Sequence, residues 1–266
     1  MNSYSTANTT ALTADTLRSN APAIYAHAAH PKTTAAYTFI STERVLEGLQ
    51  QAGFIPVDVR QTRTRRTSPL HARHAIRLRR RYETVQLRDS IPELLFINSH
   101  DGTAAYQLRV GLFRVVCTNG LIVSVGLFPT FRVTHRGDVV EDVVQGALQI
   151  SERFTHLADH VELMEHRVLG DSERFRFAER ALALRYPTPM EHGMQPSQLL
   201  KCRRYEDQGH DLWHTLNVIQ ENLLRGGLTR WTAAGRMTRT RAITGLKEDL
   251  RLNTALWALA TEYLTT

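Results

Sequence analysis

The chain has 266 residues, enough to bury a sizeable core as one large domain or two small ones. Its 42% hydrophobic and 22% charged residues are ordinary for a globular protein, and no apolar run approaches the roughly 20 residues that span a bilayer. A membrane-spanning protein is therefore not expected. The formal net charge of +7 is unusual, and it favours nucleic acid or another polyanion as partner.

Arginine supplies almost all of the positive charge. Lys32, Lys201 and Lys247 are the three lysines among 33 basic residues, which leaves 30 arginines. The planar guanidinium fork binds phosphate bidentately and stacks on bases, which lysine cannot do. Codon bias in a GC-rich genome is an alternative cause of this ratio, but it does not explain why the arginines cluster. Cys117 and Cys202 form no CxxC motif and predict neither a disulfide framework nor a cysteine zinc site.

The N-terminal segment is rich in Ser, Thr, Asn and Ala and has no apolar stretch of the kind found in a secretory signal. We expect residues 1–35 to be a disordered or loosely ordered arm, and we expect the protein to be cytoplasmic. A short strand is predicted over Tyr37–Ile40. Ser41 or Thr42 can then cap a helix that ends before Gly53.

Alternating and apolar segments, separated by turn residues, predict an antiparallel sheet after this helix. A loop with Ser68 and Pro69 joins the first two strands into a basic hairpin. His100-Asp101-Gly102 and Asn119-Gly120 are further turn signals. The expected strands are 54–64, 73–82, 94–98, 104–113, 121–125 and 131–134.

The periodicity becomes helical after residue 138. Strands first and helices afterwards predict an α+β fold, with an N-terminal antiparallel sheet that includes a basic hairpin and one early helix, followed by a C-terminal helical half. We expect a sheet-rich region over 36–138 and a helical region over 139–266, packed as one unit. The predicted helices are 139–169 (one long helix or two shorter ones), 172–185, 211–224 and 247–264.

A basic window between Val59 and Tyr82 holds nine arginines and no acidic residue. In its second half the arginines alternate with mostly apolar residues, which predicts a half-buried strand with a cationic face toward solvent. Such a face would suit a phosphate backbone. The candidate nucleic-acid-binding residues of this window are Arg60, Arg63, Arg65, Arg66, Arg73, Arg77, Arg79 and Arg81.

A second basic window runs from Asn222 to Lys247 and also lacks carboxylates. Its central segment combines Gly, Thr and Arg, so that it offers amides, hydroxyls and guanidiniums for phosphate oxygens. A solvated loop between two helices is the alternative. The candidate phosphate ligands here are Arg236, Arg239 and Arg241, and the candidate base-stacking residues of the chain are Tyr82, Tyr106 and Trp231, each of which could equally belong to the core.

Signals for catalysis are weak. His156 and His160 are four residues apart on a predicted helix and could share a metal, but the order His-Glu-x-x-His is absent. Cys117 could act as a nucleophile, although a buried structural cysteine is the commoner case. No P-loop and no GxGxxG motif occurs. We therefore predict no catalytic residue, no metal site and no cofactor.

Several multi-residue motifs resemble one family. They are Ile97–Thr103 followed by Tyr106-Gln107, Phe113–Leu121, Arg132, Gly137–Val140, Leu184–Tyr186, Arg203-Arg204, Asp211–Trp213 and Thr238–Gly245. Together these motifs, which span about residues 36 to 264, resemble the YafZ-like uncharacterised family, part of a domain-of-unknown-function group found in prophages, plasmids, phages and integrative elements.

The resemblance implies a context and no established activity. That context is an accessory protein of a mobile element, in a group commonly neighboured by DNA-repair, anti-restriction or toxin–antitoxin genes. The polar positions within the family motifs are His100, Asp101 and Asn119; a plain hairpin turn is the alternative for His100-Asp101-Gly102.

Our leading hypothesis is a non-enzymatic nucleic-acid-binding protein of a mobile genetic element, with single-stranded DNA as the favoured ligand in recombination, annealing or replication. The expected fold is loosely like that of phage single-strand annealing proteins, which bind the backbone in a positive groove and form homo-oligomers. One alternative is an anti-restriction or anti-defence protein that binds a host protein. Another is a metal-dependent nuclease that uses His100, Asp101 or the histidine-bearing helix.

Overall fold

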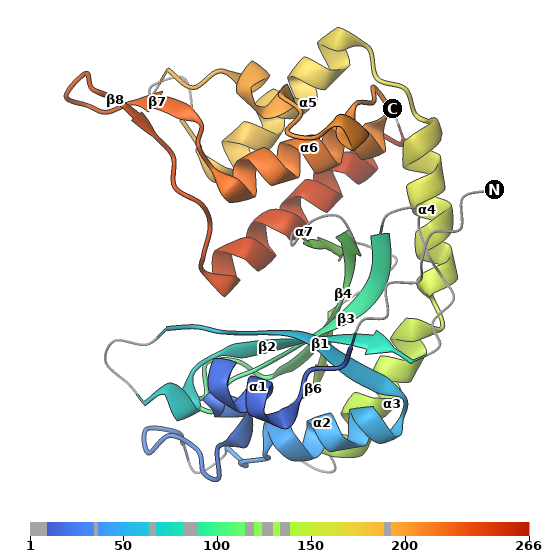
Figure 1. The fold of residues 1–266 in the computed structure, drawn as a ribbon, viewed down its shortest axis with the longest axis vertical. Helices are drawn as coiled ribbons and strands as arrows, with labels where there is room; N and C mark the ends of the chain where they lie inside the picture. The colour runs from blue at the N-terminus through green and yellow to red at the C-terminus, as the bar shows by residue number, and fades with distance from the viewer. Residues whose placement is uncertain are drawn as a thin grey trace. The chain divides into compact units, whose positions relative to one another are not determined.

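The computed structural model describes residues 10–34, 37–63, 68–81, 90–114, 120–123, 130–133, 139–188 and 193–265. The chain forms two compact units (Figure 1). Residues 1–120 with 128–154 make the first, which we call the sheet unit, and residues 121–127 with 155–266 make the second, the helical unit.

The predicted antiparallel sheet is confirmed. Its strands are β1 (Phe54–Gln61), β2 (His74–Arg80), β3 (Ser90–Asn98), β4 (Tyr106–Arg114), β5 (Gly120–Val123) and β6 (Phe131–Val133). The order is β1-β2-β3-β4-β5, and β6 also pairs with β4. The β1–β2, β2–β3, β3–β4 and β4–β6 pairs are antiparallel, so the basic hairpin of β1 and β2 forms as expected.

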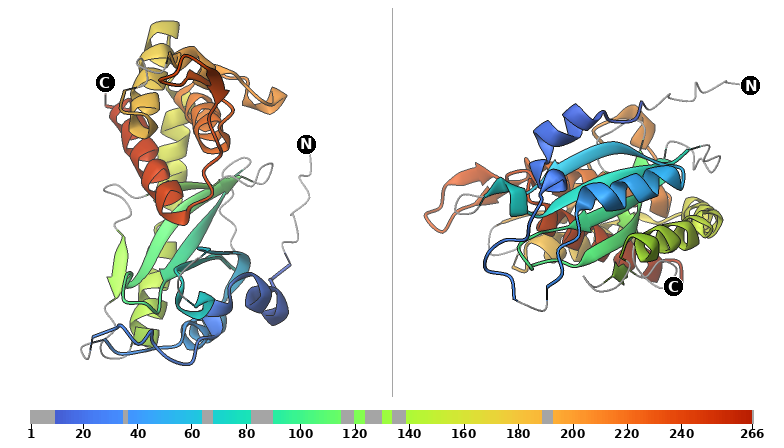
Figure 2. Two further views of the ribbon diagram at one scale, coloured as in Figure 1. Left: turned by 90° about the vertical axis from the view of Figure 1, so that its left-hand side faces the viewer. Right: turned by 90° about the horizontal axis from the view of Figure 1, so that it is seen from below.

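Two helices of the sheet unit pack against each other and against the sheet (Figure 2). The first, α2 (Thr42–Gln51), begins where Ser41 accepts a hydrogen bond from the Glu43 amide, and α3 (Val139–Ser151) follows the strands. A side-chain carbon on Gly48 would lie 2.9 Å from Val140, so glycine permits the close approach of these helices. The buried apolar residues of the strands complete this core, among them Ile76, Leu78, Leu94, Phe96 and Leu108.

The N-terminal segment packs on the sheet unit, so the expectation of a disordered or loosely ordered arm over residues 1–35 is wrong for 10–34. Helix α1 (Ala14–Asn20) leads into the 3-10 turn η1 (Pro22–Tyr25), and Leu17 and Ile24 are buried. The Leu12 amide donates to the Pro56 carbonyl at 2.8 Å, which ties the segment to β1. Local sequence pattern does not contain this long-range contact.

The strand predicted over Tyr37–Ile40 does not form. These residues have no regular backbone structure. The Tyr37 hydroxyl donates instead to the Ser99 carbonyl at 3.3 Å, so a side chain supplies the link that we expected from a backbone ladder. The segment therefore acts as a connection that leads to the N-cap of α2.

The helical unit contains four helices and a short hairpin among its described residues. These elements are α4 (Phe154–His166), α5 (Asp171–Arg185), η4 (Pro196–Leu200), η5 (Tyr205–Asp207), α6 (Leu212–Arg225), β7 (Thr229–Trp231), β8 (Met237–Arg239) and α7 (Leu246–Glu262). Its core includes Phe177 and Trp257, both without solvent exposure. The predicted helix over 139–169 is two helices, and because α3 packs with the sheet, the boundary between units falls near residue 154 and not at 138.

The C-terminus of α6 positions the β7–β8 hairpin. Gly226 ends the helix at φ +68°, a conformation that favours glycine. A side-chain carbon there would lie 2.7 Å from the Arg241 carbonyl group, so the chain beyond the hairpin passes directly over this residue. Among the described helices, none is both long and apolar enough to cross a membrane.

Candidate functional site

The alternation of β2 is confirmed, but two of its arginines face a carboxylate. Glu93 of β3 is fully buried, and its Oε2 accepts a hydrogen bond from Arg77 Nε at 2.7 Å. Its Oε1 accepts from Arg79 Nε at 2.9 Å and from Arg79 Nη2 at 2.6 Å. The side chains of Arg77 and Arg79 are only 19% and 17% exposed. These contacts correct the expectation of an open cationic face, because a phosphate would first have to displace Glu93.

The other residues of the first window have separate surroundings. Arg60 lies on the surface, 3.8 Å from Asp58, and Arg63 and Arg81 are exposed. Arg73 Nη2 donates to the Thr103 carbonyl at 3.0 Å. The predicted residues Arg65, Arg66, Tyr82 and Asn119 lie outside the described part of the chain.

The sheet unit contains an arginine cluster that was not predicted, formed by Arg73, Arg109 and Arg132. Gln107 of β4 pairs with Arg132 of β6, and Arg109 lies two residues further along β4, on the same face. Burial, together with the charges of Arg132 and Arg73, lowers the pKa of Arg109. The alternation of Gln107 and Arg109 was a visible signal, but the pairing that adds Arg132 depends on the sheet register.

The family-motif residue His100 lies in the core. It shares a hydrogen-bonded group with Thr42, His74 and Asn98, all fully buried. Thr42 Oγ1 is 3.0 Å from His74 Nε2 and 3.2 Å from His100 Nε2, and it accepts from Asn98 Nδ2 at 3.0 Å. This group joins the first residue of α2 to the ends of β2 and β3.

Asp101 shapes the turn that follows His100. Its Oδ1 accepts from the Thr103 amide at 3.0 Å and from the Thr103 hydroxyl at 2.6 Å. Gly102 adopts φ +75°. These local bonds form an Asx-type turn, so the sequence Asp101-Gly102-Thr103 has a structural role that the plain-turn alternative anticipated.

The buried His74 makes stability depend on pH. Burial lowers the pKa of His74 to about 4, whereas an unfolded histidine titrates near 6.5. Between these values the unfolded chain binds more protons, so stability is lost as pH falls through this window, by on the order of 3 kcal/mol. Urea unfolding at pH 7 and pH 4 should show this loss in the wild type. It should be much smaller in His74→Asn and unchanged in His27→Asn, whose histidine is exposed. The same loss in both variants would contradict the assignment.

The two histidines on α4 lie in different environments. His156 Nδ1 is 3.9 Å from Asp159 on the surface, whereas the His160 ring lies 5.9 Å from the Trp257 ring. Burial lowers the pKa of His160. Within the described ranges, no group of three or more His, Cys, Asp or Glu side chains is arranged to hold a metal ion.

The second basic window folds into the β7–β8 hairpin, a strand pair that we did not predict from the sequence. Arg230 pairs with Thr238, and Trp231 pairs with Met237. Successive strand residues point to opposite faces. Arg230 and Thr238 therefore share one face of the hairpin, while Trp231, Met237 and Arg239 share the other.

Side chains from neighbouring elements hold this hairpin in place. The Gln198 amide of η4 accepts from the Thr229 nitrogen at 2.7 Å and donates to its carbonyl at 3.2 Å. Arg185, the last residue of α5, donates to the Leu223 carbonyl and, at 2.7 Å, to the Arg241 carbonyl. The hairpin base is thus attached to η4, α5 and α6.

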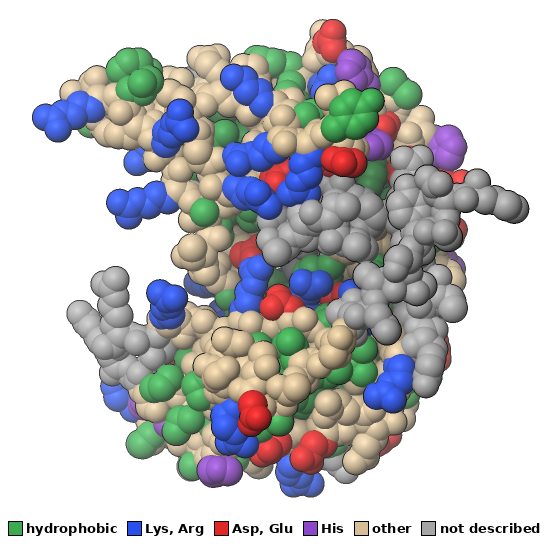
Figure 3. All heavy atoms as spheres, viewed as in Figure 1, with side chains coloured by type: hydrophobic (Ala, Val, Ile, Leu, Met, Phe, Trp, Pro, Cys, Tyr) green, Lys and Arg blue, Asp and Glu red, His purple; other side chains and the backbone are tan. Residues whose placement is uncertain are grey.

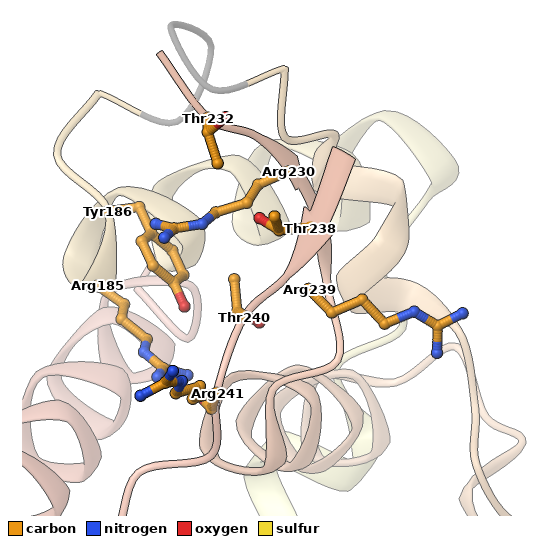
Figure 4. A pocket seen from close by; sticks show the side chains of 8 residues that line it. All are labelled: Arg185, Tyr186, Arg230, Thr232, Thr238, Arg239, Thr240 and Arg241. Atoms are coloured by element: carbon orange, nitrogen blue, oxygen red, sulfur yellow. The ribbon is translucent and has the colours of Figure 1, made fainter. Parts of the chain in front are cut away.

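The inner face of the hairpin lines a pocket of about 470 Å³ (Figure 4). Figure 4 shows Arg185, Tyr186 and Arg241 gathered at one side, whereas Arg239 extends away from them. The residues that line this pocket are Arg185, Tyr186, Arg230, Thr232, Thr238, Arg239, Thr240 and Arg241. This lining set contains four arginines, three threonines and a tyrosine, and it contains no carboxylate.

The outer face of the hairpin exposes a large aromatic side chain. Trp231 is 48% exposed and Met237 is 66% exposed. Trp231 rests on Gly193, where a side-chain carbon would come within 2.5 Å of its Cδ1 atom. Arg236 and Arg239 are exposed as well, and Figure 3 shows separate basic side chains and a hydrophobic patch on the segment that corresponds to β7 and β8. Proteins that bind single-stranded nucleic acid commonly combine an exposed aromatic ring with basic side chains.

Tyr106, also a candidate for base stacking, belongs to the core. It is buried, its ring lies parallel to Phe96 with centroids 5.7 Å apart, and its hydroxyl donates to the Ile40 carbonyl at 2.5 Å. This is a correction to the expected role, since a base cannot reach the ring. Of the candidate stacking residues that the structure describes, Trp231 is accessible.

Comparisons with known proteins agree with the motifs found in the sequence. Residues 29–257 match the family model described as "Domain of unknown function (DUF932)". Two relatives from Escherichia coli (strain K12), UPF0380 protein YfjQ and UPF0380 protein YafZ, are each 37% identical over 255 residues, which cover 96% of this chain and 92% of the relative. No solved structure matches the chain. The YafZ-like resemblance is thereby confirmed, and the chain belongs to the DUF932 family.

Proposed function

We propose that this protein is a non-enzymatic nucleic-acid-binding protein of a mobile genetic element, which acts in the cytoplasm and binds single-stranded DNA in recombination, annealing or replication. The observation that carries the proposal is the β7–β8 hairpin. One of its faces exposes Trp231 beside Arg239, and the other lines a carboxylate-free pocket of arginines and threonines.

Single strands are favoured because of the exposed tryptophan. In a duplex the base faces are stacked within the helix, whereas an unpaired base is free to stack on an aromatic ring. Neighbouring arginines would bind the phosphates on either side of that base. The contacts to phosphate make the binding salt-dependent and independent of sequence.

The test is fluorescence anisotropy of labelled single- and double-stranded oligonucleotides across a salt series from 50 to 200 mM. We expect the single strand to bind more tightly. Trp231→Ala should lower that affinity by about tenfold, since stacking contributes about 1–3 kcal/mol per base. Tyr205→Ala is the matched control, because Tyr205 is an 81% exposed aromatic residue of the same unit and should bind as the wild type does.

Two results would contradict this proposal. If the wild type binds neither oligonucleotide at 50 mM salt, nucleic acid is not the ligand. If Trp231→Ala and Tyr205→Ala have equal affinities for the single strand, the hairpin face does not stack on bases. Circular dichroism of each variant is the check that the fold is retained.

A second candidate function is anti-defence activity through a host protein. The same exposed Trp231 and Met237, next to Arg239, are residue types enriched at protein interfaces. A pull-down from nuclease-treated host extract distinguishes the two candidates. A protein captured by the wild type and lost with Trp231→Ala favours this second function, whereas loss of all capture after nuclease treatment favours nucleic acid.

A further inference from the structure

The inner pocket of the hairpin has features that the outer, stacking face does not require. We infer that this pocket binds the terminal phosphomonoester of a nucleic-acid strand. The inference rests on the proposed function and adds a preference for phosphorylated strand ends.

Two buried polar atoms of the pocket have no protein partner. Arg230 Nε and Thr238 Oγ1 lie side by side in the hairpin register, and neither makes a hydrogen bond within the described part of the chain. A buried donor without a partner costs about 1–3 kcal/mol. A small movement of these side chains toward the pocket would let an anionic oxygen accept from both atoms, which would remove this penalty.

One arginine of the pocket, Arg185, is preorganised for ligand binding. Arg185 is fixed by its bonds to the Leu223 and Arg241 carbonyls, and its guanidinium carbon lies 5.1 Å from the Tyr186 ring centroid. Two of its five N–H groups are used in these bonds, which leaves others for an anion. A charge held in place in this way loses little conformational entropy on binding.

The number of positive charges favours a monoester over a diester. Arg185, Arg230 and Arg241 line the pocket together with Thr232, Thr238 and Thr240 hydroxyls. A terminal phosphate carries a charge of about −1.5 to −2 at pH 7 and has three strong acceptor oxygens, whereas a backbone diester carries one charge. The volume of about 470 Å³ lies in the range of small-molecule sites, so a whole terminal nucleotide can enter.

The experiment uses one labelled single strand in three forms, with a 5′-phosphate, with a 3′-phosphate, or with hydroxyls at both ends. We expect one phosphorylated form to bind the wild type at least tenfold more tightly than the hydroxyl form. Arg230→Gln and Thr238→Val should each remove most of this preference. Trp231→Ala should weaken all three forms by the same factor and leave the preference intact.

The pH dependence of the preference for phosphorylated strands provides a second test of the pocket. The second pKa of a phosphomonoester is about 6, so the preference should increase from pH 5 to pH 7.5, whereas diester binding has no such transition. Equal affinity for the three forms at pH 7.5 would overturn the pocket inference and leave the proposed function standing.

A thermal-shift assay tests the case in which the pocket binds a phosphomonoester but the protein does not bind nucleic acid. If no oligonucleotide binds, but adenosine 5′-monophosphate raises the melting temperature of the wild type and not of Arg230→Gln, the phosphomonoester site is supported and the proposed function fails. Adenosine is the control without phosphate. An equal shift by adenosine, or an unchanged shift in Arg230→Gln, counts against the site.

Discussion

Replacing Glu93 with glutamine is expected to lower the free energy of unfolding by about 3–5 kcal/mol. Glu93 has no solvent exposure and accepts three hydrogen bonds from Arg77 and Arg79. Glutamine keeps the volume of the side chain but removes its charge. Two mostly buried guanidiniums would then lose the charge of Glu93, and Arg77 would keep its contact with the Asp58 carboxylate at 3.5 Å. Removal of one partner is the destabilising case for a buried ion pair.

Urea unfolding followed by circular dichroism measures this effect. The control is Glu47→Gln on α2, which makes the same chemical change at an exposed position and should alter stability by less than about 0.5 kcal/mol. A loss below about 1 kcal/mol for Glu93→Gln would mean that water or other groups compensate the two arginines.

The pairing of Glu93 with Arg77 and Arg79 also limits which arginines of the first basic window can be used to test nucleic-acid binding. Charge reversal of Arg77 or Arg79 would place a carboxylate against buried Glu93, and we expect the resulting repulsion to destabilise the sheet unit strongly, irrespective of any ligand. Lost nucleic-acid binding in such a variant carries no information on the interface. Arg63 and Arg81, which are exposed, are the positions of this window where a substitution tests binding directly.

The double variant Arg236→Glu/Arg239→Glu is expected to lower single-strand affinity by about a hundredfold at 100 mM salt. Each charge-assisted hydrogen bond to phosphate contributes about 1.5 kcal/mol, and about 1.4 kcal/mol corresponds to a factor of ten. Both side chains are exposed, and Arg236 bonds to the turn through its backbone nitrogen, which donates to the Thr232 hydroxyl at 3.2 Å. The hairpin should therefore fold normally in the variant.

Anisotropy titrations at several salt concentrations provide the measurement. The slope of log K against log salt should become shallower by about 1.4, since two phosphate contacts are lost at about 0.7 each for a single strand. Arg176→Glu/Lys201→Glu is the control, because it makes the same change in net charge at two exposed positions of the same unit. Equal losses in the two double variants would show that net charge, and not the hairpin, governs binding.

Local pattern predicted much of this protein correctly. The alternation of β2, the N-cap at Ser41 and the stop of α6 before two glycines all depend on residues within a few positions of one another. The family motifs likewise identified the DUF932 relationship. In each case the signal and the structure occupy the same short segment, so backbone periodicity and turn chemistry suffice.

Tertiary structure determined which charged side chains are exposed to a ligand and which are paired within the fold. Periodicity predicted a cationic face on β2, but only the pairing with β3 placed Glu93 against Arg77 and Arg79. The same holds for Arg109 and Arg132, which the β4–β6 register brings to one face, and for the N-terminal segment, which is ordered by contacts with β1.

The β7–β8 hairpin shows most clearly what the sequence predicts and what only the tertiary structure determines. Composition by itself showed that residues 222–247 lack carboxylates and contain Trp231 among arginines. It did not show that Arg230 and Thr238 face a pocket while Trp231 and Arg239 face solvent. That division arises because strand pairing sends alternate side chains to opposite faces, and because Arg185 and Gln198, distant in sequence, hold the hairpin so that one face lines a pocket.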